Sequence, residues 1–180
     1  VLREVYTTIS TRDIASRRTI IDALTSGALM DNNPLKELVA KYVDDRLLQR
    51  IAEESLKGRL LLIGTTNMDA QRPVLWSMGA LARSSHPKAL QLFRDIMVAS
   101  ASIPGVFPPV LVDVQGSDGK PYDEMHCDGG VSTQVFLYPA AFSFHDLPDE
   151  AAARRQRRVY VIRNARLAAE YQQIERKLMP

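Results

Sequence analysis

A change of hydrophobic spacing at Gly58 constrains the fold of this chain more than any other feature. Residues 32–58 carry apolar side chains at helical spacing, and the pair Asp44-Asp45 allows a break into two helices. Asn33 suits a helix cap, Pro34 the first helical position and Gly58 the end. The run "RLLLIGTTN" that follows is short, apolar and rich in β-branched residues. This composition is typical of a strand buried on both faces, as in a parallel sheet.

The alternation of helices and strands continues along the rest of the chain. A second strand, near a sheet edge, is predicted at residues 72–82 and a helix at 86–102. Two further strands are predicted at 107–114 and 122–130, joined by the turn "GSDGKP", and a late strand and a helix at 157–165 and 167–179. Before the long helical region, residues 1–16 are predicted to be partly loop and 17–29 a short helix ending near Gly27. The pattern predicts a layered α/β domain with a mainly parallel sheet, formed by residues 1–180 as a single domain.

Composition excludes several classes of function. The 23 Lys and Arg residues against 21 Asp and Glu give a net charge of +2, which is too balanced for nucleic acid as the main partner. The single cysteine, Cys127, excludes an internal disulfide framework. No apolar run of about 20 residues and no signal peptide is visible in the sequence, which leaves the compartment open. The chain starts at Val1 rather than at Met, and we expect it to be a piece of a longer polypeptide.

The stretch "EMHCDGGVSTQ", residues 124–134, permits two interpretations. Asp-Gly between extended segments is a common hairpin turn, because both residues tolerate positive φ. Alternatively, Asp128 is half of an active site, since ligands bind at the carboxyl ends of strands in parallel α/β sheets. From the local sequence alone the turn is the favoured interpretation, and the surrounding segments decide between the two.

The order of these segments resembles the patatin-like phospholipase family over residues 58–139. The resemblance is carried by "GRLLLIGTTNMDAQRPVLWSMGALA", by the helix end "ASASIPGVFPP" and by the "DGG" of Asp128, Gly129 and Gly130. It implies a three-layer α/β/α domain with a mainly parallel sheet. It also implies an acyl hydrolase that cleaves carboxylic ester bonds of lipids or phospholipids with a Ser-Asp dyad and without a metal or organic cofactor. Asp128 matches the position of the base, which takes the serine proton without a histidine between them.

The sequence departs from the family pattern at the nucleophile. The family places its serine in Gly-x-Ser-x-Gly and its oxyanion donors in a Gly-rich loop, and neither pattern occurs in these 180 residues. We therefore expect an N-terminally truncated domain, inactive by itself, whose serine lies outside the chain. Two alternatives remain: a catalytically inactive binding or scaffold module, and a hydrolase that uses another nucleophile such as Ser132 or Cys127.

Other candidate residues have simpler explanations. His126 and Cys127 are adjacent and point to opposite faces of a strand, which argues against a zinc site. His126 could belong to a triad, but a hydrogen-bonded strand histidine is favoured. Ser100 and Ser102 are expected to pack at a helix end. The aromatic residues are candidates for an acyl pocket but are more often core residues; they are Trp76, Phe107, Phe136 and Phe142.

Partners follow from charge and from the expected truncation. The basic run at residues 154–158 is either a solvated surface or a contact with anionic lipid head groups, which would make the protein a peripheral membrane protein. A sheet that lacks strands would expose an edge through which copies of the chain pair. We therefore expect a lipid or other ester substrate and no nucleic acid. Peripheral membrane contact and self-association through a sheet edge are further candidates, and for the basic run the solvated surface is the favoured interpretation.

Overall fold

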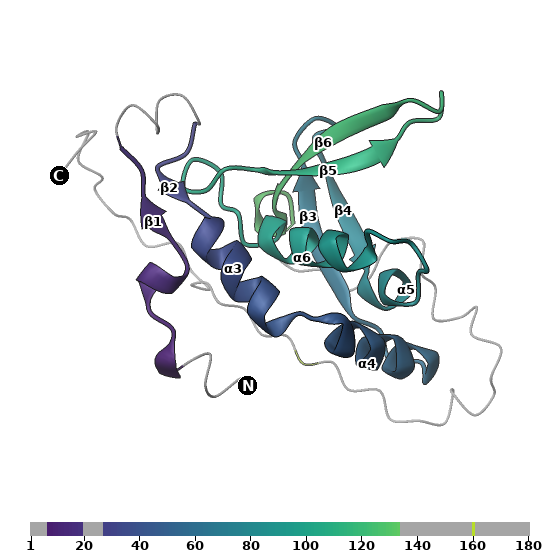
Figure 1. Ribbon diagram of the computed structural model, residues 1–180. Coiled ribbons are helices and arrows are strands. Elements are labelled where there is room, and N and C mark those ends of the chain that lie inside the picture. Colours follow the sequence, from purple (N-terminus) through teal and green to yellow (C-terminus); the bar gives the residue numbers. More distant parts are fainter. Residues whose placement is uncertain (1–6, 20–26, 134–159, 161–180) are drawn as a thin grey trace. The chain divides into compact units, whose positions relative to one another are not determined.

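The computed structural model describes residues 7–19, 27–133 and 160 (Figure 1). The chain divides into two compact units, Val1–Pro139 and Ala140–Pro180, and of the second unit only Tyr160 is described. The fold below is that of the first unit, and the single domain over residues 1–180 stays a prediction. The predicted helix at 167–179, the basic run at 154–158 and, apart from Tyr160, the late strand lie outside the described residues, as does most of the helix predicted at 17–29.

The described residues form a mixed α/β structure, which confirms the predicted fold class (Figure 1). In chain order the elements are η1 (Thr11–Asp13), β1 (Ser16–Arg17), β2 (Met30–Asp31), α3 (Asn33–Tyr42), α4 (Asp45–Leu56), β3 (Leu62–Asn67), β4 (Arg72–Ser77), α5 (Met78–Ala82), α6 (Ala89–Ala99), β5 (Val110–Gln115), β6 (Pro121–Asp128) and η2 (Gly129–Val131). Among these described elements, no helix has the length and apolar character needed to cross a bilayer.

The long helical region is divided at the predicted break. The Asp44 side chain caps α4 by accepting a hydrogen bond of 2.8 Å from the Leu47 amide. Gly58 follows α4 with a φ of +85°, a conformation that glycine adopts without strain. Asn32 rather than Asn33 is the N-cap residue of α3, and its side chain makes no capping hydrogen bond.

The main sheet has the order β4-β3-β6-β5 and is antiparallel throughout. The prediction of a mainly parallel sheet was therefore wrong. Residues 68–71 join β3 to β4 and residues 116–120 join β5 to β6, whereas a parallel crossover needs about a dozen residues or more. β4 lies at an edge, as predicted for the strand at residues 72–82, but that strand ends at Ser77 and gives way to α5.

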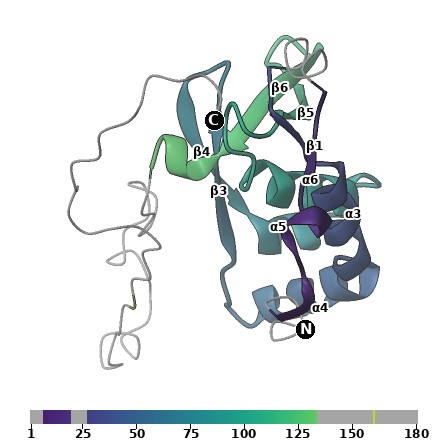
Figure 2. The ribbon, with the colours of Figure 1, turned by 90° about the vertical axis from the view of Figure 1, so that its left-hand side faces the viewer.

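One face of the sheet packs on the helices. Ile63 and Trp76 are paired across β3 and β4 and pack against a core cluster that contains Met78, Phe93 and Ile96. Figures 1 and 2 show α5 and α6 beside the strands of this sheet. Residues that are paired across strands share a face, and neighbours along a strand point to opposite faces. Both described helices that pack on the sheet, α5 and α6, therefore cover the Ile63 and Trp76 face, and no second helical layer is described within residues 27–133.

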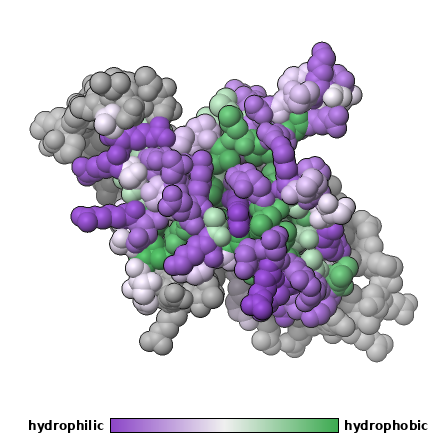
Figure 3. All heavy atoms as spheres, viewed as in Figure 1, coloured by the Kyte–Doolittle hydropathy of each residue, from purple (hydrophilic) through white to green (hydrophobic). Residues whose placement is uncertain are grey.

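The other face of the sheet exposes part of its apolar side chains. Leu62 is 39% exposed and Leu111 is 57% exposed, whereas Thr65, Thr66 and Asn67 at the carboxyl end of β3 are buried. The expectation that this run is buried on both faces therefore holds only for its carboxyl end. On the face of the molecule seen in Figure 3, polar side chains cover most of the surface, and hydrophobic ones show in patches between them.

Candidate active site

Asp128 ends β6 and starts a tight turn rather than a hairpin. Its Oδ1 atom accepts a hydrogen bond of 2.7 Å from the Gly130 amide, which makes it the cap of η2. The residue is half-buried, and no described residue donates a hydrogen bond to Oδ2. One carboxylate oxygen thus holds the turn while the other is available to another group. The turn and the active-site interpretations of Asp-Gly-Gly are compatible in this geometry.

Two neighbouring segments hold the main chain of Asp128. Its amide donates to the Ser102 carbonyl oxygen at 2.9 Å, at the end of α6. Its own carbonyl oxygen accepts from Thr66 Oγ1 at 3.0 Å, and Thr66 Oγ1 lies 2.8 Å from Ser132 Oγ. Ser132 Oγ also lies 3.4 Å from the Gly129 carbonyl oxygen, so the two hydroxyl groups share two protons among three contacts and either can donate to the other. Contacts on both sides of the residue fix the direction of the carboxylate.

Gly129 is required by its packing against β3. A Cβ atom at this position would lie 2.5 Å from the Gly64 oxygen and 2.7 Å from the Gly64 carbonyl carbon. Real Cβ atoms essentially never approach backbone atoms so closely, so any larger residue would displace the turn from β3. Gly130 is less constrained, because its Cβ would lie 3.1 Å from the Asp128 Oδ1 atom. Gly130 contributes its amide to the carboxylate.

His126 belongs to a buried polar group beside Asp128. Trp76 Nε1 donates to Thr65 Oγ1 at 2.7 Å, and Thr65 Oγ1 lies 2.9 Å from His126 Nδ1. His126 Nε2 faces Glu124 Oε2 at 3.5 Å. Burial lowers the pKa of His126 below its ordinary value, and the carboxylates of Glu124 and Asp69 oppose that effect.

Thr65, His126 and Glu124 follow one another as hydroxyl, imidazole and carboxylate, which is the order of a catalytic triad. This group is, however, closed to substrate. Thr65 is 0% exposed and His126 is 1% exposed, so no ester can reach the hydroxyl group. His126 is thus a hydrogen-bonded strand histidine, which was the favoured interpretation. Among the described ranges, no group of three or more His, Cys, Asp or Glu residues is placed to hold a metal ion.

The alternative nucleophiles lack the surroundings that would activate them. Cys127 is 2% exposed, and burial, with a smaller contribution from the Asp128 charge, raises the pKa of its thiol. A protonated, buried thiol is a poor nucleophile. Ser132 is exposed, and its hydroxyl group contacts only Thr66 and the Gly129 carbonyl in the part of the chain that is described.

Ser100 and Ser102 bond within their own helix end, as expected. Ser100 Oγ donates to the Met97 carbonyl at 2.8 Å and Ser102 Oγ to the Val98 carbonyl at 2.9 Å. Of the candidate pocket aromatics, Trp76 packs against the core and Phe107 is half-buried, while Phe136 and Phe142 lie outside the described residues.

The described cavities lie away from Asp128. They have volumes of about 580, 330 and 250 Å³ and lie between α6 and β5, beside α4, and between α3 and α6. Asp128 lines none of these three. The surroundings of Asp128 are therefore defined by its hydrogen bonds and by the packing of Gly129 on β3, and these three cavities do not take part in them.

Fold and site together describe an α/β protein that presents a fixed aspartate at the end of an internal strand. The family model for Patatin-like phospholipase matches residues 3–141. The chain therefore belongs to this family of lipid acyl hydrolases, as its sequence motifs had indicated. No curated protein matches the chain.

Proposed function

We propose that Asp128 is the base of a Ser-Asp dyad in a hydrolase of lipid or phospholipid esters, and that the serine lies outside these 180 residues. The main support for this proposal is the hydrogen bonding of Asp128. Its main chain is held by Ser102 and Thr66, Oδ1 is occupied by Gly130, and Oδ2 has no donor among the described residues. A serine hydroxyl is a weak nucleophile and needs such a base within hydrogen-bond reach.

The reaction takes place in two halves. Asp128 accepts the serine proton as the serine oxygen attacks the ester carbonyl carbon, and the ester bond to the alcohol breaks. The proton passes to the departing alcohol, which leaves an acyl-serine. Asp128 then takes a proton from water, the resulting hydroxide attacks the acyl group, and the serine leaves with that proton. No metal and no organic cofactor is required by these steps.

Replacement of Asp128 in the full-length protein tests this role. Asp128→Asn keeps the shape of the side chain but removes its basicity, and we expect ester turnover to fall at least about a hundredfold with unchanged thermal stability. Asp123→Asn, an exposed residue on the same strand, is the matched control and is expected to keep full activity. Near-normal turnover of Asp128→Asn refutes the proposal.

The lack of Gly-x-Ser-x-Gly in the chain favours a second candidate, a binding or scaffold module that kept the fold. The sequence of the full-length protein separates the two, because only the hydrolase requires that motif. A fluorophosphonate probe tests the third candidate, in which Ser132 or Cys127 acts as nucleophile. Labelling of the 180-residue chain itself would contradict our expectation that it is inactive alone.

We also propose that the protein contacts lipid surfaces through the basic run at residues 154–158. Each basic residue near an anionic bilayer contributes about 1 kcal/mol to binding. Sedimentation with phosphatidylserine vesicles and with neutral vesicles measures this contact. Equal binding to both would argue against a role for the basic run.

A further inference from the structure

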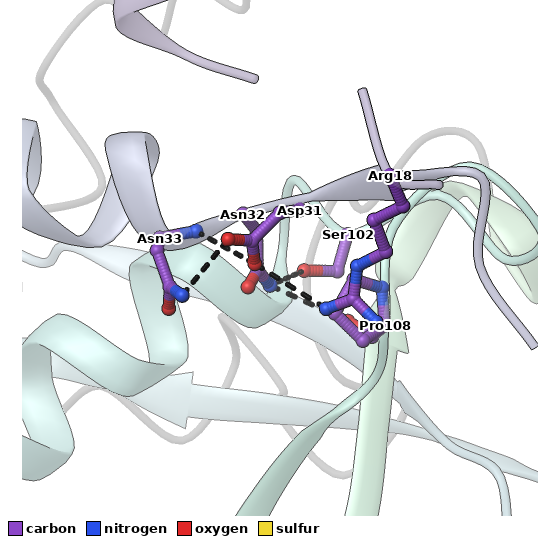
Figure 4. Close-up of polar contacts among 6 residues, drawn as sticks. All are labelled: Arg18, Asp31, Asn32, Asn33, Ser102 and Pro108. Atoms are coloured by element: carbon purple, nitrogen blue, oxygen red, sulfur yellow. Dashed lines mark hydrogen bonds and ion pairs between the residues drawn. The ribbon is translucent and has the colours of Figure 1, made fainter. Parts of the chain in front are cut away.

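Asn32 is a buried polar residue that the proposed reaction does not use. It is 1% exposed, occupies the N-cap position of α3 and makes no capping hydrogen bond with its side chain. Its side chain instead points toward Ser102 and Pro108 (Figure 4). Within the described residues, its Oδ1 atom has no hydrogen-bond partner. A buried amide with an unpaired oxygen destabilises a protein, so stability alone does not explain this residue.

The hydrogen bonds fix the direction of the Asn32 amide. Nδ2 lies 3.5 Å from Ser102 Oγ and 3.4 Å from the Pro108 carbonyl oxygen. Ser102 already gives its hydroxyl proton to the Val98 carbonyl, and a carbonyl only accepts, so Asn32 is the donor in both contacts. Both distances are longer than the roughly 2.7–3.2 Å of most N–H···O hydrogen bonds, so each contact is weak.

Main-chain bonds join the same two segments. The Leu29 amide donates to the Gly105 carbonyl at 3.1 Å, and the Met30 amide donates to the Val106 carbonyl at 2.8 Å. With the Asn32 contacts, residues 29–32 are bound at several points to the stretch 102–108. That stretch contains the Ser102 carbonyl, which accepts the Asp128 amide at 2.9 Å.

We propose that Asn32 is a positioning residue for Asp128 and acts through Ser102. This inference rests on the proposed role of Asp128 as base. The Asn32 amide holds the Ser102 hydroxyl group, and the Ser102 carbonyl holds the main chain from which the carboxylate projects. A displacement of about 1 Å at a reacting group lowers rates by up to about a hundredfold, so a contact two steps away from the carboxylate affects turnover.

Kinetics of the full-length protein test this inference with two variants. In Asn32→Ala and in Ser102→Ala we expect kcat to fall between about tenfold and about a hundredfold, with KM changed less than about twofold. A general loss of stability would instead lower the amount of active protein and the melting temperature. Ser102→Ala keeps the test decisive if Asn32→Ala fails to fold.

Two neighbouring residues provide matched controls. Ser100→Ala removes a hydroxyl group that also bonds within the end of α6 but does not touch Asn32 or Asp128. Asn33→Ala removes an exposed amide that bonds to Asp31. Both controls should keep their kcat. Hydrogen exchange of the peptide around Asp128 should increase in Asn32→Ala and Ser102→Ala and stay unchanged in the two controls.

The outcomes separate this inference from the function on which it depends. If Asp128→Asn is inactive but Asn32→Ala and Ser102→Ala keep normal kcat and normal exchange, the positioning role is overturned and the base stands. If Asp128→Asn turns over at a near-normal rate, the base itself is overturned and the positioning role falls with it. A selective fall of kcat in both variants supports the inference.

Discussion

The two glycines that follow Asp128 have different roles. Gly129 is buried against β3, where a Cβ atom would lie 2.5 Å from the Gly64 oxygen. We expect Gly129→Ala to lower the free energy of unfolding by about 1–3 kcal/mol, because the turn or β3 must shift to relieve the overlap. Gly130→Ala is the control, since its Cβ would meet only the Asp128 carboxylate, and its effect should be smaller. Urea unfolding measures both, and equal effects would contradict the packing argument.

His126 makes stability depend on pH near neutrality. Burial lowers its folded-state pKa below the value of about 6.5 in the unfolded chain, so the unfolded state binds the proton first as the pH falls. The stabilising contribution is therefore complete above about pH 6.5 and is lost as the pH decreases toward the lowered folded-state pKa.

Urea unfolding at about pH 7.5 and about pH 5.5 measures this effect. We expect the chain to be less stable at the lower pH, and His126→Gln to lose most of the difference. His86→Gln, at an exposed histidine, should leave it unchanged. An equal pH dependence in both variants would show that other groups cause it.

At the scale of elements, α4 depends on its cap. Asp44 accepts the Leu47 amide at 2.8 Å and so pairs one of the donors that a helix start leaves open. We expect Asp44→Ala to cost about 1 kcal/mol of stability, whereas Asp45→Ala, one residue later and without such a bond, should cost only a few tenths. Thermal unfolding compares them, and a larger effect of Asp45→Ala would place the start of the helix elsewhere.

Local patterns predicted the elements better than their arrangement. Helical spacing predicted α6, the pair Asp44-Asp45 predicted the break between α3 and α4, and the segment "GSDGKP" predicted the turn between β5 and β6. Strand direction was missed, because an apolar run such as the one that contains β3 looks alike in parallel and antiparallel sheets. The short connections at residues 68–71 and 116–120 carried that information.

The candidate site was predictable only in part. The Asp-Gly-Gly motif identified Asp128, but nothing in the local sequence pointed to Thr66, Ser102 or Asn32 as its supports. Thr66 and Asp128 are 62 positions apart, and Asn32 and Ser102 are 70 apart, so their contacts depend on how the elements pack. The close approach of Gly129 to Gly64 depends in the same way on the pairing of β6 with β3.

At the scale of the whole molecule, the two edge strands of the described sheet differ in how well they can form hydrogen bonds with a further strand. In an antiparallel pair, every second residue directs its amide to the neighbouring strand, and the residues between them direct theirs outward. The bond from the Met78 amide to the Leu61 carbonyl shows which amides of β4 point outward, and the bond from the Gly116 amide to the Lys120 carbonyl shows the same for β5. In β4 the outward position at Pro73 has no amide proton, which blocks part of that edge. In β5 the outward amides are those of Leu111, Asp113 and Gln115. β5 is therefore the better edge for another copy of the chain.

We expect the 180-residue chain to self-associate through β5. Leu111 is 57% exposed on this strand, and a lysine there would repel its counterpart in a second copy without removing a hydrogen bond within the sheet. Sedimentation velocity across a concentration series should show association of the unaltered chain and a shift toward monomer for Leu111→Lys. Leu29→Lys makes the same change at a leucine that is 66% exposed outside this sheet, and it should leave association unchanged. A strictly monomeric unaltered chain, or an equal effect of both lysines, would show that this strand edge does not pair.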